Sequence, residues 1–429
     1  MAVEDAGTDP ASGRSESEPA PDIPPSLPPW AAFAFRDYRI LWFSSVASLI
    51  TMQLRMLVAG VWLYDATGSG VQLGMLGVVQ LAVQLPGILY GGALADQMDR
   101  KKLIALTQSA SFVVIAILAA LMAADALAPW HIYASTAFLG LTSMLGNPAR
   151  SALTANLVPR SHLMHAVTAN TATFQIGAIL APLAFAAAVT RFGMTPTFVL
   201  AAVIAIPAFL MPLMIRTQGM PIDRQGEGSM VRRIVEGFHY VRVHPILPGL
   251  YIMDVGVTIV SHYRLILPMI ADKMFRAGAG AVGILNAANS SGGVLGTFAV
   301  LSLTRFRAKG MLVVYATLIY TLLLIVFGLN TWLWLGTIII IGMGASDAIG
   351  MTTRQTTVQL TTTDNMRGRA VSFSSMSAMS ANNLGTFEVG YMSEQIGAGN
   401  TMILGGVIGA VVVLAMWVLV RGMREYRYP

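Results

Sequence analysis

Long apolar runs follow one another along this chain, separated by short breaks that contain charged residues, glycine or proline. Most runs reach the roughly 20 residues that an α-helix needs to cross the hydrocarbon core of a bilayer. The pattern predicts an all-α integral membrane protein with twelve transmembrane helices. Their expected limits are 39–64, 72–95, 102–124, 131–156, 166–190, 195–215, 246–271, 279–303, 310–329, 332–360, 370–395 and 401–420.

Three of these helices, over 131–156, 332–360 and 370–395, are less apolar than the others because Asn, Ser and Thr interrupt them. Hydrocarbon offers polar side chains no hydrogen-bonding partner, so such helices are tolerated where they face protein or a water-filled cavity. We therefore expect these three helices to face the interior of the bundle.

The composition agrees with a bilayer as solvent. Hydrophobic residues make up 55% of the chain and charged residues 11%, whereas soluble domains carry about 25% charged residues. The chain has no cysteine, which excludes disulfides, thiolate metal sites and cysteine nucleophiles. The net charge of +6 is better explained by membrane topology than by a nucleic-acid partner.

Residues 1–29 are rich in Pro, Ser, Glu, Asp and Ala and contain almost no large apolar side chain. Such a segment buries too little surface to offset the entropy lost on ordering. We expect residues 1–34 to form a disordered cytoplasmic tail. The segment lacks the basic and apolar regions of a signal peptide, so the first helix is expected to act as an uncleaved insertion signal.

Lysine and arginine are distributed very unevenly between the two sides of the predicted bundle. One side has only Arg191, Lys273 and Arg276, and the other collects most of the cations, among them Arg150 and Arg354. The positive-inside rule then places both termini in the cytoplasm, with the protein in the inner (plasma) membrane. An even number of helices, such as twelve, satisfies this orientation.

The longest internal loop separates six helices from six. Within it, apolar residues recur at helical spacing from 230 to 243 with charged residues between them, which predicts an amphipathic cytoplasmic helix on the membrane surface, acting as a tether. The expected organisation is therefore a tail (1–34), a six-helix bundle (35–216), a linker (217–245), a second six-helix bundle (246–421) and a C-terminal tail (422–429).

The two halves also resemble each other. A shift of 204 residues superposes Arg150 on Arg354 and Gly193 on Gly397, and a shift of 205 superposes 87 and 91 on 292 and 296, all glycines. A Gly-x-x-x-Gly pair lets two helix backbones approach closely. Two parallel repeats indicate alternating access by rocking of one half against the other, which favours a transporter over a receptor or an anchor.

The turn at residues 91–102 has Gly92, then Asp96 four residues later, then a basic cluster from Arg100 to Lys102. It resembles the loop between helices two and three of the major facilitator superfamily. Further similarities to the enterobactin-exporter-like, multidrug-efflux branch occur at 35–39, 62–64, 67–69, 147–150 and 367–370. The resemblance covers residues 35–425 and implies two pseudo-symmetric six-helix bundles.

By this resemblance, Asp96 lies against the N-terminus of helix eleven, and the contact holds the cytoplasmic side shut. The chain departs from the superfamily pattern at Gln97, where arginine is usual, and at Asp99, where glycine is usual. A static anchor is the alternative role for the turn. The predicted conformational gate consists of Gly92, Asp96, Asp99, Arg100, Lys101, Arg367 and Arg369.

Helix five offers a second similarity to exporters, which often carry a Gly-Pro signature there. This chain has Gly177, Ala181 and Pro182, followed by small residues up to Ala188. Small residues permit close helix packing where glycine is usual. The motif favours export.

Charged side chains within the predicted helices are candidates for function, because each costs at least about 2.5 kcal/mol in a bilayer. The candidates are Arg55, Asp254, His262, Arg264, Asp347 and Glu388. By the resemblance, helices one, four, seven and ten line the cavity. Our hypothesis is that Asp254 and Asp347 couple transport to protons, the alternative being structural ion pairs with Arg55 or Arg264. His262 is a shuttle or a core group, and Glu394 is expected to be interfacial.

The predicted function is a secondary active, proton-coupled exporter of amphiphilic organic molecules such as siderophores or drugs. No cofactor is expected, and no P-loop is present, so the proton gradient is the expected driving force. The expected partners are a small-molecule substrate and the lipid bilayer, not nucleic acid, and the protein is expected to be a monomer and not an enzyme. The alternatives are an importer or uniporter of a small anionic nutrient and a non-transporting membrane sensor.

Overall fold

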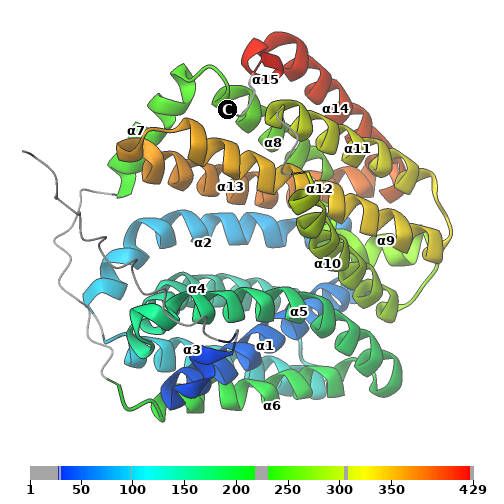
Figure 1. Ribbon diagram of the computed structural model, residues 1–429. Coiled ribbons are helices and arrows are strands. Elements are labelled where there is room, and N and C mark those ends of the chain that lie inside the picture. Colours follow the sequence, from blue (N-terminus) through cyan, green and yellow to red (C-terminus); the bar gives the residue numbers. More distant parts are fainter. Residues whose placement is uncertain (1–27, 29, 98, 218–229, 304–307, 426–429) are drawn as a thin grey trace, which may run out of the picture.

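The computed structural model describes residues 28, 30–97, 99–217, 230–303 and 308–425 (Figure 1). Of the segments expected to be tails, residues 1–27, 29 and 426–429 lie outside this described part, whereas 31–34 and 422–425 are helical. The described helices of the first half are η1 (Ala31–Ala34), α1 (Arg36–Thr67), α2 (Gly70–Gln97), α3 (Arg100–Ala123), α4 (Pro129–Leu157), α5 (Arg160–Phe192) and α6 (Met194–Leu213).

The second half begins with the linker helix α7 (Met230–Val243). It continues with α8 (Leu247–Ser261), η2 (Arg264–Ile266), α9 (Leu267–Lys273), α10 (Ala279–Ser302), α11 (Lys309–Leu329), α12 (Leu333–Thr361), α13 (Asp364–Ile396), α14 (Ala398–Leu419) and α15 (Arg421–Glu425). If α8 to α9 is counted as one span, the twelve predicted spans are all present, which confirms the all-α membrane fold.

Within the described residues, nine spans are long and apolar enough to cross a bilayer, and α2 adds a shorter apolar segment, Gly70–Gln84. The two helices outside this group, α4 and α13, are two of the three that the sequence marked as less apolar. The third, α12, does meet the requirement. Burial among other helices lets α4 and α13 carry their polar side chains.

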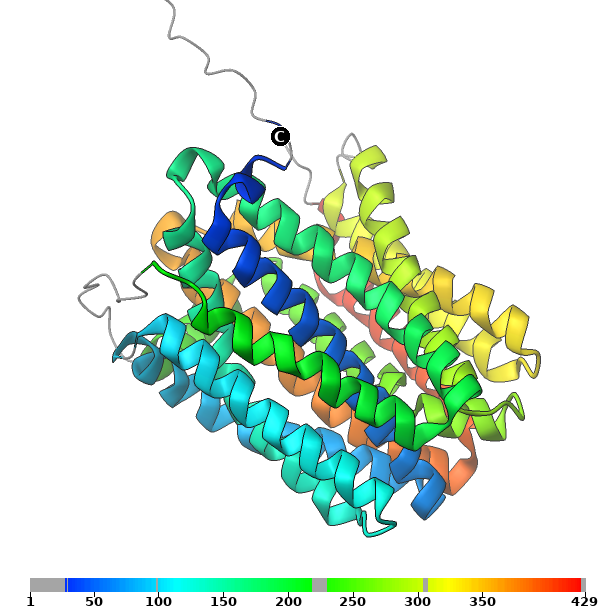
Figure 2. The same cartoon turned by 90° about the horizontal axis from the view of Figure 1, so that it is seen from below.

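The helices form two groups, α1–α6 and α8–α14, which lie on either side of a central plane in Figure 1 and run alongside each other in Figure 2. Across that plane α2 lies against α13 and α5 lies against α10. Figure 1 shows α2 and α13 diverging towards the end of the bundle that carries α7.

Both crossings depend on residues without side chains. A Cβ atom on Gly77 of α2 would lie 2.3 Å from the main-chain oxygen of Asn383, and one on Gly283 of α10 would lie 2.3 Å from that of Pro182. There is no room for a methyl group at either place, so the backbones of the two groups are in direct contact.

The repeated glycines have a packing role. A Cβ atom on Gly292 or Gly296 of α10 would lie 2.1 Å or 2.3 Å from the main-chain oxygen of Ile341 or Ala345 of α12. In the first half, Gly87 of α2 meets Met144 of α4. The second helix of each half therefore packs closely on the fourth.

The seventh span differs from the prediction of one continuous helix over 246–271, which is wrong. Regular helix α8 ends at Ser261, His262 and Tyr263 are not helical, and α9 starts again after a single turn of 3-10 helix. Pro268 lacks an N–H and its ring crowds the carbonyl four residues earlier, so it favours an interruption of the α-helix here. Apolar character continues across the break, which is why the hydrophobic pattern did not show it.

The linker helix α7 has the predicted limits, 230–243. It packs against α13 as well as presenting apolar side chains such as Val235 to the surroundings, so it does more than tether the halves. A Cβ atom on Gly237 would lie 2.5 Å from the main-chain oxygen of Arg369, and the rings of Phe238 and Phe373 are 5.7 Å apart.

Candidate functional site

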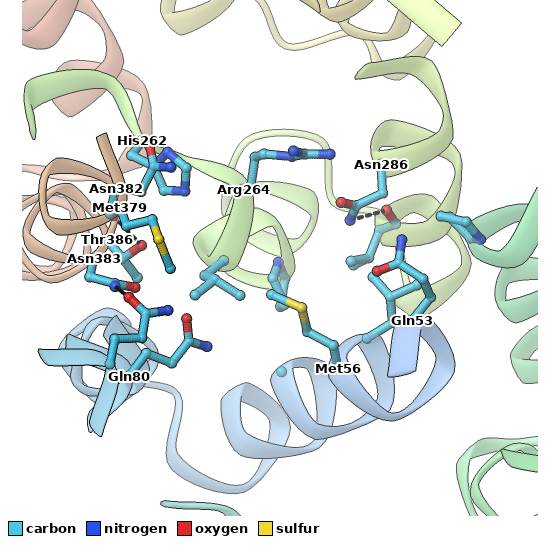
Figure 3. A pocket seen from close by; sticks show the side chains of 17 residues that line it. Gln53, Met56, Gln80, His262, Arg264, Asn286, Met379, Asn382, Asn383 and Thr386 are labelled. Carbon is cyan, nitrogen blue, oxygen red and sulfur yellow. Dashed lines mark hydrogen bonds between the residues drawn. The ribbon is translucent and has the colours of Figure 1, made fainter. Parts of the chain in front are cut away.

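The broken seventh span lies between two cavities. The first, of about 300 Å³, lies between the two halves (Figure 3). The second, of about 250 Å³, is lined by residues of the second half alone. His262, Arg264 and Asn382 line both cavities, so the break in the helix places these side chains where the cavities meet.

Amide side chains dominate the polar lining of the first cavity. Asn383 Nδ2 donates a hydrogen bond to Gln84 Oε1 at 2.6 Å, which joins α13 to α2 across the central plane. Amides both donate and accept hydrogen bonds, and methionine adapts to ligands of different shape. The amides are Gln53, Gln80, Gln84, Asn286, Asn382 and Asn383, and Met56 and Met379 supply apolar surface among them.

Arg264 is the cation of this lining. It is solvent-exposed, and among the described residues it has no ion-pair or hydrogen-bond partner. Figure 3 shows its side chain extending into the space towards the side of Asn286. Aspartate and glutamate are absent from the described lining of the first cavity.

The second cavity brings Asp254 and Asp347 together. Asp254 Oδ1 lies 2.7 Å from Nη1 of Arg354, and their side chains are only 14% and 13% exposed. The partner of Asp254 is therefore Arg354, not Arg55 or Arg264 as the structural alternative had it. Asp347 is exposed to the cavity.

The first half contains a matching arginine. Arg150 Nη1 donates to Ser45 Oγ at 2.7 Å, so an arginine of α4 contacts α1 just as Arg354 of α12 contacts α8. These arginines lie about two turns inside their helices, within the limits 131–156 and 332–360 that the sequence predicted. The repeat keeps the arginine and exchanges its partner, a hydroxyl in one half for a carboxylate in the other.

The two remaining charged candidates do not take part in either cavity. Arg55 of α1 and Glu388 of α13 line neither of them. Glu388 Oε2 is buried and has no hydrogen-bond partner among the described residues. A role for either side chain in contacting substrate has no support in this arrangement.

The predicted gate is described in part, because the side chains of 91–98, including Gly92 and Asp96, lie outside the described residues. Asp99 caps α3, accepting from the N–H of Lys101 at 2.9 Å. Arg100 begins that helix, and Lys101 Nζ donates to the main-chain oxygen of Ile215.

The basic residues of α13 in the predicted gate have partners on their own side of the central plane. Arg367 pairs with Asp364 at 2.6 Å, and Arg369 Nη1 lies 3.0 Å from Glu236 of the linker helix. The sequence did not predict the contact of Arg369 with Glu236, because the helical pattern of 230–243 does not show which helix its charged face contacts.

The small-residue motif of helix five lies where α5 meets its neighbours. A Cβ atom on Gly177 would lie 2.4 Å from Leu49 of α1, and Ala181 is 2% exposed. Pro182 presents its carbonyl to Gly283 across the central plane. Gly177 therefore packs within the first half, and Pro182 packs at the junction of the halves, where it also lines the first cavity.

Side-chain hydrogen bonds join the halves at the end of the bundle opposite α7. Tyr64 donates to Asp272 Oδ2 at 2.9 Å, and Glu394 accepts from Ser69 Oγ at 2.5 Å and from the N–H of Val71 at 2.8 Å. Glu394, expected to be merely interfacial, thus connects α13 to α2.

A bundle of two similar six-helix groups around a polar cavity defines a secondary transporter of the major facilitator type. The sequence profile of the transmembrane secretion effector family matches residues 27–425, and the chain belongs to that family of membrane transporters. The predicted superfamily and branch are thereby confirmed.

Relatives and solved structures agree with this assignment. The chain is 26% identical over 349 residues to the enterobactin exporter EntS of Escherichia coli O81 (strain ED1a), covering 78% of this chain and 79% of the exporter. The nucleoside transporter NupG superposes with a TM-score of 0.73 at 12% identity, covering 91% of this chain and 100% of NupG. A bacterial homologue of the lysosomal transporter Spinster, inward-facing and unoccupied, gives 0.71 at 14% identity, covering 94% and 99%. At these identities, the two structures support the fold alone.

Proposed function

We propose that this protein is a proton-coupled exporter of amphiphilic organic molecules, siderophores or drugs, in the inner membrane with both termini in the cytoplasm. The observation that carries the proposal is the amide- and methionine-lined cavity at the junction of the two halves. Such a lining offers hydrogen bonds and adaptable apolar contacts together, which suits amphiphilic ligands. The likeness to an enterobactin exporter supports the direction.

In this proposal the two bundles, 35–216 and 246–421, rock about the glycine crossings of α2 with α13 and of α5 with α10. The small residues at these crossings let backbones slide past each other without side chains interlocking. The hydrogen bonds from Tyr64 and Ser69 to the second half close one end and break when the substrate leaves. The protein then works as a monomer, since each chain holds a whole cavity.

We place proton coupling in the second cavity, on Asp347 and on Asp254 with its partner Arg354. A carboxylate that gains and loses a proton beside a fixed guanidinium can make and break an ion pair during the cycle. The pair shares the second cavity with Arg264 and His262, which also line the substrate cavity. A change of charge in one cavity therefore changes the electrostatic potential in the other.

Everted membrane vesicles test the direction and the coupling together. A proton gradient, acid inside, is expected to drive accumulation of an exporter-type dye and of a catecholate siderophore by the wild type. Asp347→Asn should lose gradient-driven accumulation and keep exchange of substrate in the absence of a gradient, because exchange needs no net proton movement.

Asp125→Asn is the matched control, since Asp125 is exposed and has φ 53°, which asparagine tolerates equally well. Accumulation of either substrate by intact cells instead of everted vesicles would overturn export and favour the importer of an anionic nutrient, for which the unpaired Arg264 is the specific observation.

A further inference from the structure

We infer that the cavity between the halves binds an organic anion, with Arg264 as the counter-charge of its acidic group. The inference rests on the proposed function only in taking this cavity as the substrate site, and it holds for either direction of transport. The ligand class is a carboxylate, phenolate or phosphate ester with further hydrogen-bonding groups and an apolar body.

The position of Arg264 is unusual for a membrane span. It belongs to the single 3-10 turn, η2, that follows the end of α8, where the regular α-helix is interrupted. A side chain there can extend away from the helix axis, and Figure 3 shows it doing so within the cavity. The buried neighbours Tyr263 and Ile266 hold the turn in place from the other side.

The charge of this arginine is not balanced within the first cavity. All other described polar residues of the lining are amides, threonine or histidine. A guanidinium that faces a cavity is stabilised by a hydrogen-bonded anion. The described walls of the first cavity supply no carboxylate, and Asp347 faces Arg264 from the second cavity, so a bound anion is the species that supplies the counter-charge on the first-cavity side.

Asp254 and Asp347 are not placed to bind a cationic ligand in the first cavity. Asp254 is paired with Arg354, and both aspartates line the second cavity, which Arg264 also lines, and not the first. A cationic ligand in the first cavity would meet the Arg264 guanidinium before any acid. The walls therefore favour an anion and disfavour a cation of the same size.

The amides extend the recognition beyond the acidic group. Gln53 and Gln80 come from the first half, and Asn286 and Asn382 from the second. A ligand whose hydroxyl or carbonyl groups hydrogen-bond to these four amides bridges the two halves. An anion without such groups contacts Arg264 of the second half alone. Carboxylates flanked by hydroxyls fit this combination.

Binding to the purified protein in lipid nanodiscs tests the inference without any assumption about direction. The probes are carboxyfluorescein, an organic anion, and rhodamine 6G, a cation of similar size, followed by fluorescence anisotropy. Wild type should bind carboxyfluorescein more tightly than rhodamine 6G. Arg264→Gln should weaken carboxyfluorescein binding at least tenfold, Arg264→Lys less, and Arg264→Glu should reverse the preference.

Arg191→Gln is the matched control, because it removes one exposed cation at the end of α5 that lines neither cavity. A second measurement needs no variant: benzoate should displace carboxyfluorescein from the wild type, and benzylamine of the same shape should not. Tighter binding of rhodamine 6G by the wild type, equal binding of carboxyfluorescein by folded Arg264→Gln, or equal displacement by benzoate and benzylamine would overturn the inference. Anion binding combined with failure of export in everted vesicles would leave the anion site standing and remove the export proposal.

Discussion

Glu394, near the end of α13, caps the first turn of α2 by accepting hydrogen bonds from Ser69 Oγ at 2.5 Å and from the N–H of Val71 at 2.8 Å. Capping of a helix N-terminus by a carboxylate is common, because unpaired N–H groups and the helix dipole both favour negative charge there. Here the cap comes from the opposite half of the molecule. It is therefore a contact that any separation of the halves at this end has to break.

Glu394→Gln should open this end more often. Loss of a charged contact at an exposed site is worth about 1 kcal/mol, which is roughly a fivefold change in the ratio of closed to open molecules. The chain contains no cysteine, so Gln80→Cys in the cavity lining reports access without background. Labelling by an impermeant maleimide from outside intact cells should rise severalfold.

The exposed neighbour Gln395, replaced by Asn, serves as the control and should leave labelling at the wild-type rate. Unchanged labelling in Glu394→Gln would show that the cap does not help to hold this end shut.

Asp254→Asn should destabilise the fold by about 3–5 kcal/mol, because it leaves a poorly exposed arginine without its counter-charge. The double variant Asp254→Asn with Arg354→Gln should recover much of that loss. Thermal unfolding of the purified variants in detergent measures both. Additive losses in the double variant would mean that the 2.7 Å contact contributes nothing to stability.

Gly283→Ala should lower stability by about 1–3 kcal/mol and slow transport, because a methyl group there meets the Pro182 carbonyl. Gly293 lies in the same helix and has open space around it, so Gly293→Ala is a matched control that should fold and transport normally. Melting temperature and dye accumulation in everted vesicles compare the two. Equal behaviour would show that α5 and α10 need not touch as closely as they do here.

The junction of α7 and α8 should weaken in mild acid. Burial lowers the pKa of His244 below its ordinary value of 6.5, although a hydrogen bond to the carbonyl of Thr361 opposes this. Its Nδ1 accepts from the N–H of Ile246 at 3.3 Å, a contact that protonation removes. Because the folded protein favours the neutral ring, this contribution to stability is complete above pH 6.5 and is lost as the pH falls through the lowered pKa.

Hydrogen exchange of residues 244–248 should therefore accelerate as the pH falls below 6.5, after correction for the intrinsic rate. His244→Gln should remove that pH dependence. The Arg232 hydrogen bond and the charge of Arg369 lower the pKa of Glu236. The contact of Glu236 with α13 therefore persists to a lower pH than the contact of His244. Changes in exchange just below pH 6.5 are then due to His244 and not to Glu236.

The sequence predicted the spans well because bilayer burial leaves one strong signal, uninterrupted apolar length. It did not predict the break at His262, since the residues on both sides remain apolar and Pro268 alone is compatible with a kinked helix. The limits of α7 could be read directly, because its charged and apolar faces alternate with helical period.

The site was harder to predict, because pairing depends on which helix faces share the interior. Asp254 and Asp347 could be found as charges within spans, and the structure places them in one cavity. Their cationic neighbour Arg354 lies within the predicted helix 332–360, but it was counted with the cations of the cytoplasmic side and not among the candidate site residues. Arg55, equally conspicuous in sequence, lines neither cavity.

The two repeats have kept an arginine at the same place in the fold and differ in the residue that it contacts. Arg150 contacts the hydroxyl of Ser45, and Arg354 contacts the carboxylate of Asp254. A chimera made from two copies of the first half would keep the helix plan, with each arginine resting on a hydroxyl that does not titrate. It would contain no acid at that position able to sense the voltage or the acidity across the membrane. Divergence after duplication has thus given the shared arginine a titratable partner in the second half alone.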